Sequence, residues 1–418
     1  MAVRTSGWHA SARTTRRDPP PGKLARTSSR VLLTAGLYQF VTYACFFNLT
    51  PLYPQIARDL GLDAGALGSL IGVGGIVSLL AQIPGGSGGD RWGRRPFFGV
   101  ALALLLLSQL ARWQAQTPAI LLLAQVLGGA AQGIATVNAW ALVADAAASG
   151  RSGQSFGILN ASLALGLVGG YLFAGALGSI VGWRLMSLAL AAVPLLAVFA
   201  LGWIPRRQAQ LAAARPGLMT VLRSLLDRRR LALAAMAALT LGAGQGALYL
   251  LPFSAQQQDL GAFAAAVLLV PYVVGSVIAG PLGGRLSDQL GSRPLILSLL
   301  ALGVVACVAL VWGAANSAVL VLCFVLVGAS VNGALPLLAA RVISLGDTAG
   351  IGAGSIMAGL RMGQSSGTFL GPAVAGLVLA RAGLDAGWLA QAACLLASLA
   401  LHEVVPSHAR PLETEPAV

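Results

Sequence analysis

The sequence predicts an all-α membrane protein built from two related halves, and three observations support this. Apolar residues make up 57% of the 418 residues and charged residues only 10%, which is far less charge than a soluble protein needs to cover its surface. A glycine-rich, charged segment returns later in the chain, with Asp288 following Asp90 by 198 positions. A basic stretch near the middle separates six apolar runs from six more.

Twelve apolar runs are each long enough for one transmembrane helix, which needs about 20 mostly apolar residues. They start near positions 31, 66, 97, 118, 154, 184, 231, 261, 294, 317, 351 and 386. The runs are continuous, whereas strands of an outer-membrane barrel would alternate. The expected organisation is a disordered cytoplasmic tail over 1–30, a six-helix bundle over 31–204, a basic cytoplasmic linker over 205–230, a second six-helix bundle over 231–403 and a cytoplasmic tail over 404–418.

The basic residues predict how these helices are oriented. Of the 27 Lys and Arg, 22 fall in the chain ends and in alternate loops. Arg361 falls within a span, and the last four fall in the other loops: Arg58, Arg112, Arg184 and Arg381. The positive-inside rule then places both termini in the cytoplasm. Because the net charge of +14 is concentrated at this one membrane face, it favours the lipid bilayer, and not nucleic acid, as the partner. A single lysine among 27 basic residues suits a GC-rich bacterial genome, so a bacterial inner membrane is expected.

The repeated segment carries the most specific pattern in the chain. Its first copy reads Gly85-Gly86-Ser87-Gly88-Gly89-Asp90-Arg91-Trp92-Gly93-Arg94-Arg95-Pro96, and its second reads Gly284-Arg285-Leu286-Ser287-Asp288-Gln289-Leu290-Gly291-Ser292-Arg293-Pro294. A short, charged, glycine-rich turn that occurs once in each half resembles the signature loop of the major facilitator superfamily. The proteins of this family are secondary transporters built from two six-helix halves. The resemblance covers roughly positions 31 to 403.

The resemblance implies a fold of twelve transmembrane helices in two pseudo-symmetric six-helix bundles, and a gate at this loop. In the family the loop Asp helps to latch spans two and eleven together, and the first Arg of the pair contacts an acid at the inner end of span four, where Asp145 stands here. A carboxylate that faces a helix N-terminus is also stabilised by the helix dipole. The alternative is a simple topological anchor in the lipid headgroups. The gate residues implied are Gly86, Asp90, Arg91, Gly93, Arg94, Arg95, Asp145, Asp288 and Arg293.

Small residues recur at helical contact spacing on spans two, five, eight and eleven, which form the seam between the halves in the family. Gly68 and Gly72 mark span two, and the other stripes are Ser162, Gly166, Gly170, Ala174 and Gly178; Gly275, Ala279 and Gly283; and Gly359, Gly363, Gly367 and Gly371. Such stripes let helix backbones approach closely within lipid. Simple static packing explains them equally well, so they support the fold more than any motion.

Polar residues within the spans outline a candidate substrate cavity. They are Gln39, Tyr43, Asn48, Gln125, Gln132, Thr136, Gln245, Tyr249, Asn332, Arg361 and Gln364. Each is as easily an interhelical hydrogen-bonding residue, but together they predict an amphipathic pocket for neutral or weakly charged organic molecules. Arg361 shares a helix face with Gln364 and Thr368. A charge inside the membrane is a functional candidate, and its alternative is an Arg that snorkels toward the interface.

The titratable residues do not decide whether transport is coupled to a proton. All thirteen carboxylates fall in loops, tails or helix ends, and the three histidines lie near the chain ends. Coupling through Asp59 or Asp259, at the outer ends of spans one and seven, is one possibility, and a protein without proton coupling is the other. Gln125 stands where many proton-coupled family members carry Arg, and Tyr171 replaces the Pro of the antiporter motif in span five.

The predicted function is secondary active transport. The chain shows no phosphate-binding loop, metal cluster or nucleophile–base pair, so we expect no enzyme activity, no cofactor and no metal. We expect a monomer that exports a small organic metabolite or drug by alternating access. The alternatives are uptake or facilitated diffusion of a sugar-like or anionic solute, and a transporter-like membrane sensor or assembly partner.

Overall fold

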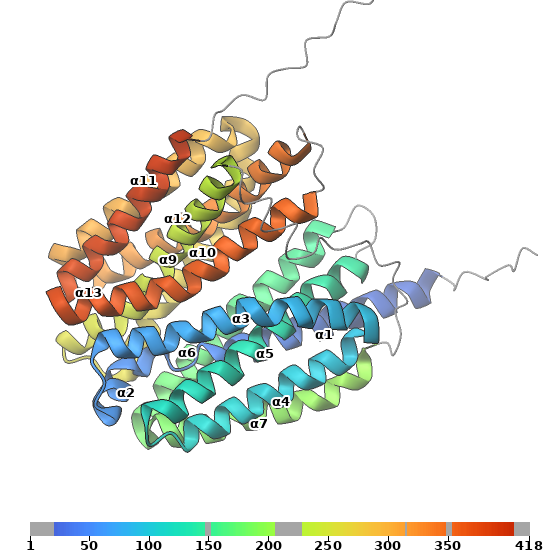
Figure 1. Ribbon diagram of the computed structural model, residues 1–418, viewed down its shortest axis with the longest axis horizontal. Coiled ribbons are helices and arrows are strands. Elements are labelled where there is room, and N and C mark those ends of the chain that lie inside the picture. Colours follow the sequence, from blue (N-terminus) through green and yellow to red (C-terminus); the bar gives the residue numbers. More distant parts are fainter. Residues whose placement is uncertain (1–20, 147–151, 205–227, 314–315, 348–352, 405–418) are drawn as a thin grey trace, which may run out of the picture.

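The computed structural model describes residues 21–146, 152–204, 228–313, 316–347 and 353–404. Every regular element within these ranges is a helix (Figure 1), which confirms the predicted all-α class. In chain order they are α1 (Pro21–Phe46), the 3₁₀-helix η1 (Thr50–Leu52), α2 (Tyr53–Leu60), α3 (Ala64–Trp92), α4 (Arg94–Trp113), α5 (Pro118–Ala146), α6 (Ser152–Leu190), α7 (Ala192–Ala197), the 3₁₀-helix η2 (Val198–Trp203), α9 (Arg228–Gln257), α10 (Ala262–Leu290), α11 (Ser292–Gly313), α12 (Ser317–Asp347) and α13 (Ala353–Val404).

Ten stretches of the described residues are long and apolar enough to cross a membrane, and two of these each contain a chain reversal. Residues 157–203 and 360–402 form the two longest stretches. Gly182 interrupts the first with φ 81°, and Gly383 interrupts the second with φ 84°. A positive φ costs glycine little and strains other residues, so these glycines allow the helix to turn back. Figure 1 shows α13 as two limbs that meet in a V. Counted as limbs, the ten stretches supply the twelve predicted spans.

The two halves repeat each other with an offset of 198 residues. Helices α3 and α10 are both 29 residues long, and they end at Gly93 (φ 89°) and Gly291 (φ 82°). The turns before them also match, because Gly61 and Asp259 both have positive φ. The repeat that the sequence indicated is therefore present in the backbone geometry.

The domain boundaries differ from the prediction mainly at the first helix. Helix α1 begins at Pro21, so residues 21–30 of the predicted tail are helical. Helix α9 begins at Arg228, which places 228–230 of the predicted linker in the second half. The remainder of both tails and of the linker lies outside the described residues.

The seam between the halves is formed by α3 against α13 and by α6 against α10. On α3, a Cβ added at Gly68 would collide with the carbonyl of Pro372, and one at Gly72 would meet the backbone and ring of Phe369. On α6, Gly175 lies against Ala262. At these positions the helix backbones of the two halves lie in direct contact, because no side chain separates them.

Three of the four predicted small-residue stripes pack mainly within their own half. Gly363, Gly367 and Gly371 lie against the α9 backbone, and Gly166 and Gly170 lie against α1. Gly275 lies against α12. Small-residue periodicity indicates that a backbone comes close, but it does not identify which backbone. Only the stripe of α3 faces the seam.

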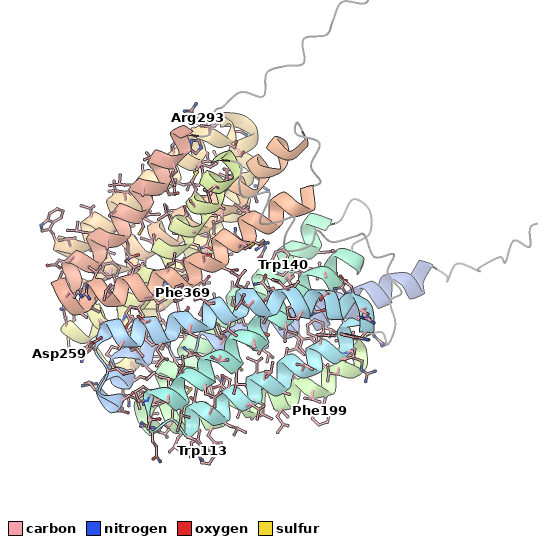
Figure 2. All side chains as sticks on the ribbon, viewed as in Figure 1. Trp113, Trp140, Phe199, Asp259, Arg293 and Phe369 are labelled. Carbon is pink, nitrogen blue, oxygen red and sulfur yellow. The ribbon has the colours of Figure 1, made fainter. Side chains whose placement is uncertain are left out.

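The halves meet most closely at what we call the hairpin end, which carries the turns at 61–63, 114–117 and 258–261. There the Tyr249 hydroxyl donates to the Ala64 carbonyl at 2.6 Å, and the rings of Tyr53 and Tyr249 pack with their centroids 5.3 Å apart. Helices α3 and α13 diverge toward the opposite end (Figure 1). In Figure 2, Asp259 and Trp113 mark the hairpin end, and Trp140 lies between the halves further along.

Candidate functional site

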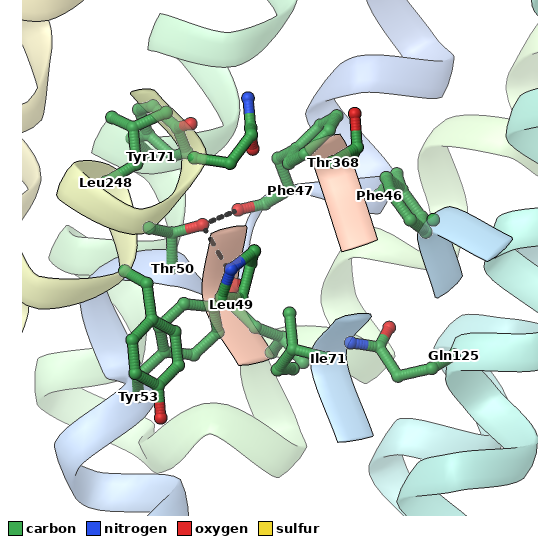
Figure 3. Close-up of a pocket in the computed structure, with 14 residues that line it drawn as sticks. Phe46, Phe47, Leu49, Thr50, Tyr53, Ile71, Gln125, Tyr171, Leu248 and Thr368 are labelled. Carbon is green, nitrogen blue, oxygen red and sulfur yellow. Dashed lines mark hydrogen bonds between the residues drawn. The ribbon is translucent and has the colours of Figure 1, made fainter. Parts of the chain in front are cut away.

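A pocket lies between the halves just inside the hairpin end (Figure 3). Both halves contribute to its lining, which consists of Phe46, Phe47, Leu49, Thr50, Tyr53, Ile71, Gly75, Gln125, Tyr171, Gln245, Leu248, Tyr249, Thr368 and Pro372. Its volume is about 30 Å³, enough for the centres of about two water molecules at ~10–15 Å³ each. An organic solute therefore needs the halves to move apart before it fits. All the lining side chains are neutral, and five are aromatic.

The wall of the pocket nearest α1 is formed where that helix breaks. Pro51 has no N–H to donate and its ring would clash with a continuing helix. The chain instead forms the short 3₁₀ turn η1, and the Thr50 hydroxyl and amide both donate to the Phe47 carbonyl, at 2.8 and 3.2 Å. This turn directs the rings that follow α1 into the pocket (Figure 3).

The second half has no such break. The offset of 198 residues pairs Pro252 with Pro54 and pairs Pro51 with Tyr249. Helix α9 accordingly runs unbroken from Arg228 to Gln257, with Pro252 inside it. The additional proline of the first half thus distinguishes the two halves at the pocket.

The break is held by a buried arginine of α4, Arg112. Its side chain is 0% exposed. One terminal nitrogen donates to the Cys45 carbonyl at 2.8 Å and to Asn48 Oδ1 at 2.6 Å. The other donates to the Phe46 carbonyl at 3.2 Å and to Gln125 Oε1 at 3.0 Å. Gln109, one turn earlier on α4, also donates to the Cys45 carbonyl, at 2.7 Å. The guanidinium therefore satisfies backbone groups that the broken helix leaves without partners.

The prediction that Arg112 lies in an outer loop is wrong. Arg112 belongs to the last turn of α4 and faces the interior of the first half. Its four hydrogen-bond partners are neutral, and among the described residues no carboxylate lies within 4.0 Å of it. The offset of 198 residues pairs it with Leu310, which is also fully buried. The buried cation is thus a feature of the first half.

The predicted cavity residues fall into three groups. Gln125, Gln245 and Tyr249 line the pocket, as does Thr368. A second group lies in the first half away from the lining: Gln132 accepts from Ser78 and donates to the Tyr43 hydroxyl at 3.4 Å, Thr136 lies one turn further on α5, and Asn48 faces Arg112. The amide of Gln39 is fully buried. In the third group, Asn332 joins α12 to α10 by donating to Tyr272 and Ser276 at 3.1 and 2.8 Å.

Arg361 lies on α13 at the face turned toward the first half. Its guanidinium stacks over the ring of Trp140 on α5, at 5.1 Å from the ring centroid. It also donates to Gln364 Oε1 at 3.2 Å. Its side chain is exposed, because it stands where α3 and α13 diverge. The described contact is therefore a cation–π pair across the two halves.

The glycine-rich loop joins α3 to α4. Asp90 and Arg94 form an ion pair at 3.4 Å, with Arg94 nearly buried. Arg91 is exposed and stacks on Trp92, Gly86 is buried in α3, and Arg95 is half-buried. In the second half Arg293 follows Gly291. The side chains of Asp145 and Asp288 lie outside the described part of the structure, so the expected pairing of Arg94 with Asp145 stays a prediction.

Comparisons of the sequence identify the family. A sequence profile of the Major Facilitator Superfamily matches residues 35–359 and 272–417. The quinolone resistance protein NorA of Staphylococcus aureus (strain MRSA252) is 27% identical over 143 residues, which cover 31% of this chain and 37% of NorA. The chain thus matches little more than a third of the length of that relative.

Solved structures show the same fold. The nucleoside transporter NupG superposes with a TM-score of 0.73 at 15% identity, covering 90% of this chain and 98% of NupG. A bacterial homologue of the human lysosomal transporter Spinster, in an inward-facing and unoccupied conformation, superposes with a TM-score of 0.72 at 16% identity, covering 93% and 96%. The match of the family profile across nearly the whole chain, on a fold of two repeated six-helix halves, shows that the protein belongs to the major facilitator superfamily.

Proposed function

We propose that the protein exports a small organic solute by alternating access. The observation that carries this is the pocket between the halves, which is closed at the hairpin end and lined by neutral polar and aromatic side chains. Parallel halves of this kind bind substrate at their interface and rock about it. The partial match to NorA, a quinolone resistance protein, favours export over uptake. We propose transport rather than chemical conversion, by a monomer in a bacterial inner membrane.

Vesicles of opposite orientation test the direction. Everted membrane vesicles that contain the protein should accumulate amphipathic organic compounds, and right-side-out vesicles should not. Accumulation only in right-side-out vesicles would favour the uptake alternative. If accumulation stops when the proton gradient is collapsed, transport is coupled to a proton. If neither kind of vesicle shows flux that depends on the protein, the result favours a sensor or an assembly partner.

We propose that both chain ends lie in the cytoplasm, with the hairpin end outside. Four basic residues lie toward the hairpin end: Arg58, Arg112, Arg184 and Arg381. The 22-to-4 asymmetry of the sequence follows the positive-inside rule and supports this orientation. We expect a C-terminal green fluorescent protein fusion to fluoresce and a C-terminal alkaline phosphatase fusion to be inactive. The reverse result would invert the topology.

Replacing Asp90 by asparagine is expected to reduce transport at least about tenfold while the protein remains folded and inserted. The substitution removes the negative charge of the Asp90–Arg94 pair, whose arginine is nearly buried, and so weakens the electrostatic contact that holds the loop at the end of α3. The rate of flux at equal expression is the measurement. The matched control is Asp385→Asn, which alters an exposed carboxylate at the hairpin end and should leave the rate unchanged. Full activity of Asp90→Asn would reduce the loop to an anchor.

Two substitutions of Arg361 are expected to show whether transport depends on its positive charge or on the planar shape of its guanidinium. Arg361→Leu loses the cation–π contact with Trp140 and the bond to Gln364, and should lower transport more than Arg361→Lys. If both abolish flux in a folded protein, the planar guanidinium itself is needed. Initial rates of an identified substrate give the comparison. Wild-type flux in Arg361→Leu would assign the residue to packing.

A further inference from the structure

We propose that the pocket selects organic anions, and that Gln125 is the residue that recognises the anionic group. The inference rests on the proposed function in one respect, since it takes this pocket as the substrate site. It is carried by the orientation of the Gln125 amide and by the uncompensated charge of Arg112 behind it.

The chemistry of arginine settles how the Gln125 amide is turned. A guanidinium has only donors and no acceptor, so the Gln125 atom that lies 3.0 Å from it must be the carbonyl oxygen. The amide NH₂ group then faces away from Arg112. Figure 3 shows the nitrogen of Gln125 on the side toward Ile71, in the pocket. The pocket therefore holds a donor that is not used within the described hydrogen bonds.

The position of Arg112 makes this donor stronger. A hydrogen bond from a cation to the amide oxygen polarises the amide, and hydrogen bonds in series strengthen one another. The Gln125 side chain is 3% exposed, so water screens the effect poorly. Gln125 thus transmits the positive charge of a residue that does not itself reach the pocket.

The charge balance of the pocket also favours an anion. No acidic residue lines the pocket, and two described carboxylates near the hairpin end have partners of their own: Asp63 accepts from the Ala66 amide at 2.7 Å, and Asp59 pairs with Arg184 at 3.3 Å. A buried cation with only neutral partners leaves a positive potential in a low-dielectric site. A substrate anion would balance it.

The aromatic lining suggests the opposite preference when it is considered alone. Phe46, Phe47, Tyr53, Tyr171 and Tyr249 contribute aromatic rings to the lining, and the faces of such rings attract organic cations. The full charge of Arg112 opposes that weaker quadrupole attraction, so we expect the rings to supply apolar contact. The substrate class that fits both features is an amphipathic carboxylate with an apolar or aromatic body.

Three probes of one skeleton test the inference: 4-phenylbutyrate, its neutral amide and the cationic 4-phenylbutylamine. Binding to the full-length protein in detergent is measured for each by isothermal titration. We expect the wild type to bind the carboxylate at least about tenfold more tightly than the amine, with the amide between them. Equal binding, absent binding or a preference for the amine overturns the inference.

Gln125→Glu provides the sharpest variant, because its carboxylate would pair with Arg112, cancel the charge and remove the donor. We expect it to lose at least about tenfold in carboxylate binding and to reverse the preference between carboxylate and amine. The control is Gln114→Glu, which makes the same change at an exposed position of the α4 C-cap, and should keep the wild-type preference. If Gln125→Glu does not fold, Gln125→Met removes the donor without adding charge, and its carboxylate affinity should fall to that of the amide. An unchanged affinity in the variant overturns the role of Gln125.

The binding assay separates this inference from the transport proposal. A wild-type protein that prefers the amine, yet moves solutes across vesicles, refutes the anion preference and leaves transport standing. A protein that prefers the carboxylate, yet supports no flux in either vesicle orientation, refutes transport and leaves the anion site standing.

Discussion

Replacing Arg112 by alanine is expected to abolish transport and to lower the free energy of unfolding by more than about 3 kcal/mol, because it removes the donor of several buried acceptors. The guanidinium supplies the hydrogen bonds of the Cys45 and Phe46 carbonyls and of the Asn48 and Gln125 amide oxygens. A buried acceptor without a partner costs roughly 1–3 kcal/mol, and the deletion also leaves a cavity in the first half. The turn after α1 would lose its support, and with it the shape of the pocket.

Thermal unfolding of the purified protein and flux in vesicles measure the two effects. Arg58→Ala is the matched control, because it removes an arginine that is exposed, and it should change the stability by less than about 0.5 kcal/mol. Arg112→Lys keeps the charge but has a single donating nitrogen, so we expect intermediate stability. A melting temperature of Arg112→Ala equal to that of the wild type would show that other groups or water support the break.

The sequence alone identified the elements whose signals are local. The twelve apolar runs agree with the described helices, once the two long stretches are divided at Gly182 and Gly383. The matched positions Gly93 and Gly291 both take positive φ, because a tight turn between membrane helices needs a residue without a Cβ. Hydropathy and glycine placement were sufficient for these features, since each depends on a few neighbouring residues.

Arg112 was misplaced because its environment is not local. A charge near the end of an apolar run normally marks the membrane boundary, and by this rule the sequence grouped Arg112 with Arg58 and Arg184. Here the carbonyls that need the charge belong to a helix broken by Pro51, distant in the sequence. One signal was available: Gln109 and Arg112 lie three residues apart on one helix face, which is unusual for a lipid-facing surface. No local pattern indicates that their common partner is the end of α1.

The partners of the small-residue stripes were unpredictable for a similar reason. A glycine stripe permits close approach on one face, yet α13 has α9 on one side and α3 on the other. Larger residues of α13, Phe369 and Pro372, meet Gly72 and Gly68 of α3, while Gly376 of α13 lies against Ala64 and Gly68. The predicted stripe of α13 therefore does not include the positions that meet α3, and glycine on one helix often faces a larger residue on the other. Such pairing requires both helices to be in place.

A disulfide across the hairpin end is expected to block transport completely and reversibly. A Cβ placed at Gly65 of α3 lies 3.7 Å from the Ala380 Cβ of α13, within the range of about 3.5–4.5 Å that a disulfide requires. The double variant Gly65→Cys, Ala380→Cys should therefore cross-link when oxidised in this conformation. Alternating access needs this end to open, so the cross-linked protein should show no flux, and reduction should restore it.

The two single variants are the controls, and each should transport equally with and without oxidant. They also measure any cost of the side chain at position 65, where the added Cβ comes within 3.2 Å of the Asp63 carboxylate. The four native cysteines are free, and three of them are buried, so they should not interfere. Because α3 and α13 converge at the hairpin end and diverge beyond it, a single bond there holds the halves in one of the two states that transport requires. Full flux through the cross-linked protein would mean that the seam of α3 and α13 does not open, and that solutes cross by another route.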